Sequence, residues 1–114
     1  MDINLIPGIA REMMTDHGVG YMSFGFADAI GPTGRAAGQT RYKGTPFIAY
    51  KIEVSLPWAR YLPEFKVREI ILHEIAHAKT PHGTGHGPAW QDYCIKYGIP
   101  ADPKFKYPSS PWDE

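Results

Sequence analysis

The sequence predicts one α+β domain in which a helix, a small sheet of about three strands and two longer helices follow one another. Three observations support this fold class. The length of 114 residues suits a single domain, and a hydrophobic content of 43% can supply its core. Apolar residues follow a helical spacing up to His17, alternate along the middle of the chain, and return to a helical spacing after Pro63. Glycine and proline residues separate these stretches.

The first helix is expected between Ile3 and His17. The apolar residues there share approximately one helical face, and Gly18 and Gly20 follow as stop signals. The apolar positions are Ile6, Ile9, Ala10, Met13 and Met14. Residues 22–27 then alternate apolar with small or polar side chains, which predicts a strand with one buried face.

Two further strands are expected, after a loop from Gly31 to Gly38 in which glycine and other small residues dominate. The second strand is short, from Gln39 to Lys43. The third, from Ile48 to Ser55, is the clearest in the chain. Alternation along it assigns Ile48, Tyr50, Ile52 and Val54 to one face and Ala49, Lys51, Glu53 and Ser55 to the other.

Proline residues mark the remaining helices. A short helical turn is expected over Trp58 to Tyr61, and a proline two residues later suits the start of a helix from Glu64 to about Lys79. Another proline opens a last helix, from Ala89 to Tyr97. We expect residues 1–101 to form the domain and residues 102–114 to form an extended proline-rich tail.

Charge and cysteine content argue against several classes of function. The 12 basic and 12 acidic side chains give no electrostatic case for tight, sequence-independent binding to nucleic acid or to an anionic membrane. Cys94 is the single cysteine, so an intramolecular disulfide and a Cys-based zinc site are excluded. Its place on an apolar helix face predicts a buried structural thiol. The sequence shows no signal-peptide pattern and no long apolar run, so we expect a soluble cytoplasmic protein without a membrane partner.

The segment His73-Glu74-Ile75-Ala76-His77, within the third expected helix, has the H-E-x-x-H pattern. Four residues are just over one helical turn, so both imidazoles project from one face and can bind the same metal ion. Glu74 lies about 100° further around the helix axis and can reach a metal-bound water without binding the metal. Zinc prefers nitrogen ligands and lowers the pKa of its water to roughly 7, and a neighbouring carboxylate can then take the proton.

The surroundings of this segment favour a metal site over an amphipathic helix with ordinary histidines. Four of the five histidines lie within residues 73–86, and the helix is nearly apolar around its two histidines. Polar side chains in such a helix need partners, which a metal can supply. A catalytic zinc usually has three protein ligands, and the candidates for the third ligand are His82, His86 and Asp92. We favour His86, because it lies in a flexible turn and Trp90 can pack one helical turn later.

The segments HEIAHA (residues 73–78) and GHGPAW (residues 85–90) resemble the SprT-like zinc metallopeptidases, whose members include the Spartan proteases that act on DNA–protein crosslinks. The resemblance covers most of residues 1–98. The N-terminal helix, an F-x-x-A segment within residues 24–29, a glycine before Gln39-Thr40 and the third strand follow the order of the family. The stretch between the second and third histidines is short in this sequence, and no Cys-rich zinc ribbon follows.

The resemblance implies a zincin-like minimal metallopeptidase domain that binds Zn²⁺. It assigns the metal to His73, His77 and His86, catalysis to Glu74, and the packing aromatic to Trp90. The expected partner is a protein or peptide substrate. A nucleic-acid partner is implied by the resemblance alone, because the neutral net charge does not support it.

The expected reaction is zinc-dependent hydrolysis of a peptide bond, in which Glu74 takes a proton from a zinc-bound water and passes it to the leaving amine. We also expect the strand from Ile48 to Ser55 to present an edge to which an extended peptide can add. Two alternatives remain open. A zinc-dependent nuclease or other hydrolase can use the same three histidines, and a non-catalytic binding module can hold a structural zinc with His82 as a fourth ligand.

Overall fold

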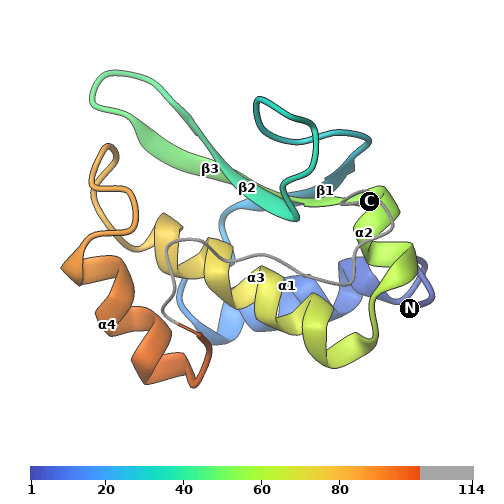
Figure 1. Cartoon of the computed structure of the whole chain (residues 1–114). Coiled ribbons are helices and arrows are strands. Elements are labelled where there is room, and N and C mark those ends of the chain that lie inside the picture. Colours follow the sequence, from blue (N-terminus) through green and yellow to red (C-terminus); the bar gives the residue numbers. More distant parts are fainter. Residues whose placement is uncertain (101–114) are drawn as a thin grey trace.

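The computed structural model describes residues 1–100, and all structural statements below refer to this part of the chain. The tail expected at residues 102–114, and with it the expected domain boundary, lies outside the described residues. Seven elements follow one another: α1 (Ile6–Asp16), β1 (Ser23–Ala27), β2 (Gly38–Lys43), β3 (Ile48–Ser55), α2 (Leu56–Tyr61), α3 (Glu64–Ala78) and α4 (Pro88–Tyr97). The predicted α+β class is confirmed. In Figure 1 the sheet forms one layer, α1 and α3 form a second layer beneath it, and α4 lies beside α3.

The sheet is mixed and has the strand order β1-β3-β2. Strand β3 pairs in parallel with β1 and antiparallel with β2. The expectation that β3 presents an edge is therefore wrong, because both of its edges are hydrogen-bonded. A central place suits the most apolar strand of the chain, since the centre of a sheet is its most buried part. Strand β2 lies at one edge of the sheet instead.

The expected faces of β3 hold for its second half only. Ile52 and Val54 are fully buried, as alternation predicts, but Ile48 is 59% exposed while Ala49 is 5% exposed. The cause is a bulge in the pairing with β2. Arg41 pairs with Lys51 and the next residue, Tyr42, pairs with Ala49, so β3 has one additional residue at this point. Such a bulge exchanges the two faces of a strand beyond it.

Helix α3 is buried on most of its surface because it contacts β2, β3, α1 and α4. The strand β3, α1 and one side of α3 enclose the main core, and a smaller cluster lies between α3 and α4. The fully buried members of the main core include Ile6, Met14, Ile52, Val54, Ile70, Ile71 and Ile75. No helix among residues 1–100 has the length and apolar character that crossing a membrane requires.

Candidate metal centre

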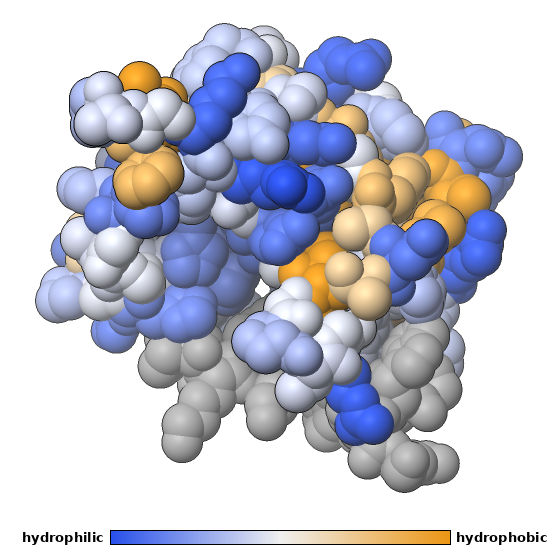
Figure 2. All heavy atoms as spheres, turned by 90° about the horizontal axis from the view of Figure 1, so that it is seen from above, coloured by the Kyte–Doolittle hydropathy of each residue, from blue (hydrophilic) through white to orange (hydrophobic). Residues whose placement is uncertain are grey.

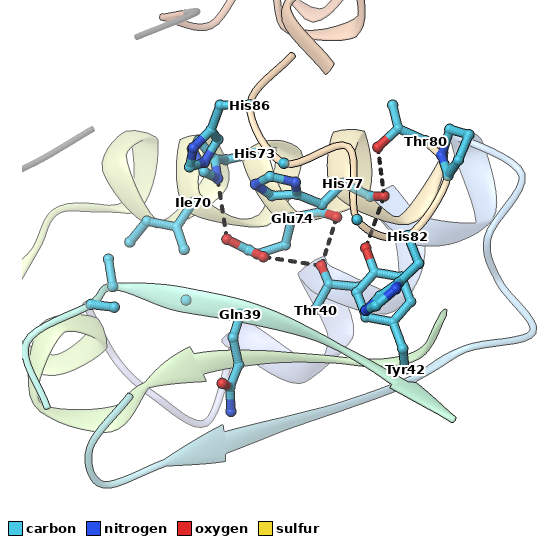
Figure 3. Close-up of a pocket in the computed structure, with 16 residues that line it drawn as sticks. Gln39, Thr40, Tyr42, Ile70, His73, Glu74, His77, Thr80, His82 and His86 are labelled. Carbon is cyan, nitrogen blue, oxygen red and sulfur yellow. Dashed lines mark hydrogen bonds and ion pairs between the residues drawn. The ribbon is translucent and has the colours of Figure 1, made fainter. Parts of the chain in front are cut away.

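Helix α3 and the loop that follows it bring together the three predicted ligands. His73 and His77 project from neighbouring turns of α3, and His86 approaches them from the loop between α3 and α4 (Figure 3). One nitrogen of each ring lies within 4.8 Å of the nitrogens of the other two. This spacing allows a single ion to contact all three rings.

The position of His86 depends on glycines and on the first turn of α4. Gly83 and Gly85 have φ angles of +89° and +54°, which L side chains rarely adopt, and they let the chain turn back toward α3. The side-chain amide of Gln91 donates to the carbonyl oxygen of His86 at 2.9 Å. A side chain of α4 therefore fixes the loop at the main chain of His86.

Trp90 contacts all three histidines, not His86 alone. Its ring centroid lies 4.6 Å from that of His86, 4.8 Å from that of His73 and 5.3 Å from that of His77. The indole is fully buried, and its Nε1 donates to the main-chain oxygen of His73 at 3.3 Å. Trp90 is thus the common support of the three rings.

The two other candidates for the third ligand lie outside this group. The ring of His82 packs against Tyr42, with centroids 4.7 Å apart, and against Phe47, with centroids 4.5 Å apart. Asp92 is exposed on α4. Neither belongs to the group of three nitrogen ligands. A site closed by His82 as a fourth ligand therefore has no support in this geometry.

Glu74 is 4% exposed and its carboxylate points toward the histidines. Its Oε2 lies 3.1 Å from Nδ1 of His73, and its Oε1 accepts a hydrogen bond of 3.0 Å from the hydroxyl of Thr40. The same hydroxyl lies 2.9 Å from the main-chain oxygen of Glu74. The carboxylate is therefore fixed beside the rings by a residue of β2.

Alternate residues of β2 contact successive turns of α3. A Cβ atom at Gly38 would lie 2.9 Å from Cγ2 of Ile70 and 3.2 Å from Cγ of Glu74, so a larger residue would displace the helix or the carboxylate. Further along the strand, the Tyr42 hydroxyl donates to the main-chain oxygen of His77 at 3.1 Å. Motif and spacing alone assign these strand residues no role at the site. The only local sequence signal that these residues act together is their alternate spacing, which places Gly38, Thr40 and Tyr42 on one face of a strand.

Burial favours the neutral, metal-binding form of the His77 and His86 imidazoles. The pKa of His77 is lowered to about 4, mainly by burial; the charge of Glu74 opposes this shift, and His73 and His86 add to it. Burial and His73 lower the pKa of His86 in the same way. Neutral imidazoles have a free lone pair near pH 7, so the donor set of three nitrogens fits a divalent transition metal.

The histidines open into a cavity of about 500 Å³ between β2, α3 and the α3–α4 loop. Glu74 is the only carboxylate among the described residues that line it, and they include no lysine or arginine. The cavity can therefore hold a metal and an uncharged chain segment, with one fixed negative charge beside the ion.

Cys94 is buried between α3 and α4, as predicted for a structural thiol. Burial, together with the charge of Glu74, raises the pKa of its thiol to about 11. The thiol is protonated at neutral pH and does not line the cavity, so it is not a nucleophile at this site.

Comparison with curated proteins and with solved structures gives no match. The sequence profile of the SprT-like family, in contrast, matches residues 15–102. This region is most of the chain, and it contains β2, α3, the three histidines, Glu74 and Trp90. The fold and the order of the elements agree with the resemblance stated above, and the chain belongs to the SprT-like family.

Proposed function

We propose that this protein is a zinc-dependent metallopeptidase. The observation that carries the proposal is a buried carboxylate, Glu74, fixed beside three imidazoles whose nitrogens lie within 4.8 Å of one another. His73, His77 and His86 would hold the ion, and the nitrogen donor set is one that zinc prefers. When bound there, zinc supplies a Lewis acid that polarises a carbonyl and acidifies a water.

Glu74 is the general base and acid of the proposed reaction. Its carboxylate takes a proton from the attacking water and returns it to the nitrogen of the leaving amine. The hydroxyl of Thr40 keeps Oε1 in place during both transfers, because it donates to that atom at 3.0 Å. The bond that breaks is the peptide C–N bond, and the bond that forms joins the carbonyl carbon to the water oxygen.

The composition of the cavity favours a peptide over a nucleic acid. A phosphodiester substrate carries a negative charge, and the enzymes that bind one commonly place lysine or arginine side chains beside it. The described lining contains no such cation and one carboxylate. A peptide bond is uncharged and needs none, so this lining supports a protein or peptide substrate.

Strand β2 is the edge at which an extended peptide would bind. Within residues 1–100 it pairs with β3 on one side, and its residues Gly38, Gln39, Thr40 and Tyr42 line the cavity. A peptide added alongside β2 would gain main-chain hydrogen bonds and lie across the histidines. The peptide-binding edge that the sequence suggested for β3 is therefore proposed for β2.

Zinc content and proteolysis of an unfolded protein substrate test the proposal together. We expect about one zinc per chain in the wild type and in His82→Ala, and a marked loss in His86→Ala. His82→Ala is a matched control because it removes a neighbouring histidine outside the group. Glu74→Gln should keep zinc and lose proteolysis by at least about a hundredfold. Zinc loss in His82→Ala alone would overturn the ligand assignment, and continued proteolysis by Glu74→Gln would overturn the mechanism.

A further inference from the structure

Two rings of the β2–β3 hairpin and one ring of the α3–α4 loop pack together at one end of the cavity; Tyr42 and His82 line the cavity, and Phe47 packs against His82 beside it. We call Tyr42, Phe47 and His82 the aromatic rim. The ring of His82 lies between the other two, at centroid distances of 4.7 Å from Tyr42 and 4.5 Å from Phe47. Figure 3 shows Tyr42 and His82 side by side, beyond His77 on the side away from His86. The rim thus joins the β2–β3 hairpin to the loop between α3 and α4.

The aromatic rim exposes apolar surface beside a concave site. Phe47 is 58% exposed, although burial of a phenyl ring is favourable. Figure 2 shows hydrophobic groups at the tip of the β2–β3 hairpin with hydrophilic groups beside them, and a separate hydrophobic area elsewhere on the same face. The hydroxyl of Tyr42 is engaged with the main-chain oxygen of His77, so the side chain offers its ring to this end of the cavity. Apolar surface beside a cavity is typical of a ligand site.

The charges around the rim define what can bind there. The other residues that line this end of the cavity are Thr80, Pro81 and Gly83, all of them neutral. The nearest lysine on the hairpin, Lys43, has its ammonium over the ring of Tyr50, 4.8 Å from the centroid. The described lining contains no lysine or arginine that could pair with an acidic side chain, and the carboxylate of Glu74 is engaged by Thr40 and His73.

We infer that the aromatic rim is a substrate subsite that binds an apolar or aromatic side chain flanking the scissile peptide bond. The inference rests on the proposed peptidase function, because the rim is continuous with the cavity that contains the histidines. A phenyl or aliphatic side chain would cover the exposed ring of Phe47 and contact those of Tyr42 and His82. The subsite therefore selects apolar residues over charged or amide ones at one position of the substrate.

Binding can be tested without catalysis. The full chain, with and without zinc, is titrated with N-acetyl-phenylalanine amide and with N-acetyl-asparagine amide while the backbone amide resonances are followed by NMR. The phenylalanine amide should shift the resonances of residues 42, 47 and 82, and the asparagine amide should not. Phe47→Ser and His82→Ala should each weaken these shifts. Equal shifts with both amides, or shifts elsewhere only, would overturn the subsite.

Cleavage preference supplies the second readout. The zinc-loaded protein digests a library of unstructured peptides, and cut sites are identified by mass spectrometry. Phe47→Ser should lower the preference for apolar flanking residues about tenfold, mainly through KM, which corresponds to about 1.4 kcal/mol. Phe65→Ser is the matched control, because Phe65 is 61% exposed, much like Phe47 at 58%, but lies on α3 outside the aromatic rim. It should leave the preference unchanged.

The two readouts separate failure of the subsite from failure of the proposed function. If the phenylalanine amide binds at the rim but no peptide is cut, the peptidase function is wrong, and the rim binds apolar side chains without being a subsite of a cleavage reaction. If peptides are cut with the same preference by Phe47→Ser, His82→Ala and the wild type, the subsite is wrong and the peptidase function stands.

Discussion

At the scale of single residues, the proposed base has two neighbours that fix its position. The hydroxyl of Thr40 donates to Oε1 of Glu74 at 3.0 Å, and Nδ1 of His73 lies 3.1 Å from Oε2. A carboxylate held at both oxygens keeps one orientation, which a proton transfer requires. We therefore regard Thr40 as a positioning residue that acts through Glu74.

Thr40→Val removes the hydroxyl and nearly keeps the volume of the side chain. We expect kcat to fall by roughly ten- to a hundredfold with little change in KM, because the hydroxyl is hydrogen-bonded to Glu74 and acts through that carboxylate. Zinc content should be unchanged. Thr40→Ser, which keeps the hydroxyl, should restore most of the activity. If Thr40→Val raises KM and leaves kcat unchanged, or if Thr40→Ser does not restore activity, Thr40 has only a packing role.

Cys94 allows a second prediction at this scale. Burial raises the pKa of its thiol to about 11, so little reactive thiolate is present at pH 8 and the sulfur is shielded from solvent. We expect the folded protein to react with a disulfide reagent far more slowly than free cysteine, and the protein in denaturant to react fully. The absorbance of the coloured thiol that the reagent releases gives the reaction rates of the folded and the denatured protein. Rapid reaction of the folded protein would contradict the buried position.

The residues that local sequence could predict at the site are those close together in the chain. His73 and His77 follow from helical spacing, and His86 follows from a turn with Trp90 just behind it. Thr40 could not be assigned in this way, because 34 positions separate it from Glu74 and no periodicity indicates which strand faces the helix. The contact depends on the fold rather than on the motif.

At the scale of elements, polar contacts around the buried carboxylate of Glu53 connect the edge strand β2 to β3. Glu53 on β3 accepts a hydrogen bond of 2.7 Å from Gln39 and forms ion pairs with Arg41 and Lys51 at 3.3 and 3.5 Å. Burial by itself raises the pKa of Glu53, but the hydrogen bonds from Gln39 and Arg41 and the charge of Lys51 lower it overall below 4.5. The folded state therefore favours the charged carboxylate.

The pH dependence of stability tests these contacts. A carboxyl group with a lowered pKa contributes stability above its unfolded pKa, and the contribution is lost as the pH falls through the folded pKa. Glu53→Gln should reduce the free energy of unfolding by about 1–3 kcal/mol at neutral pH, and the difference from wild type should shrink toward about pH 3. Urea unfolding at several pH values measures both quantities.

Glu64→Gln provides the control for this measurement, since Glu64 pairs with Arg68 on the exposed surface of α3. It should cost less than about 1 kcal/mol at any pH. A difference for Glu53→Gln that stays constant from neutral to acidic pH would mean that the charge of Glu53 does not stabilise the sheet.

The elements themselves were largely predictable, but their arrangement was not. Alternation and glycine or proline signals located every strand and helix to within a few residues. Alternation could not show that β3 lies between β1 and β2, because strand order depends on which surfaces pack rather than on the strands alone. Ile48 and Ala49 lie on the faces opposite to those expected because a bulge interrupts β3. A prediction from alternation presupposes that the strand has no bulge.

At the scale of the whole molecule, the proposed ion would tie helix α3 to the loop that leads into α4. His73 and His77 belong to α3, whereas His86 belongs to the loop, and the core between α3 and α4 is small. A chain of this size buries a modest apolar core, so a bound metal is a sizeable addition to its stability. The three imidazoles are already grouped around Trp90, and an ion would fix the loop against the helix.

Metal binding should therefore raise the thermal stability of the whole domain. Zinc at about a thousandfold excess over its dissociation constant adds about 4 kcal/mol, which corresponds to a rise in Tm of more than about 10 °C for a domain of this size. A chelator should reverse the rise. Glu74→Gln should keep it, because Glu74 is not a proposed ligand, and His86→Ala should lose most of it while His82→Ala does not. Differential scanning calorimetry of the full chain gives these values, and an equal response of His86→Ala and wild type to zinc would place the ion elsewhere.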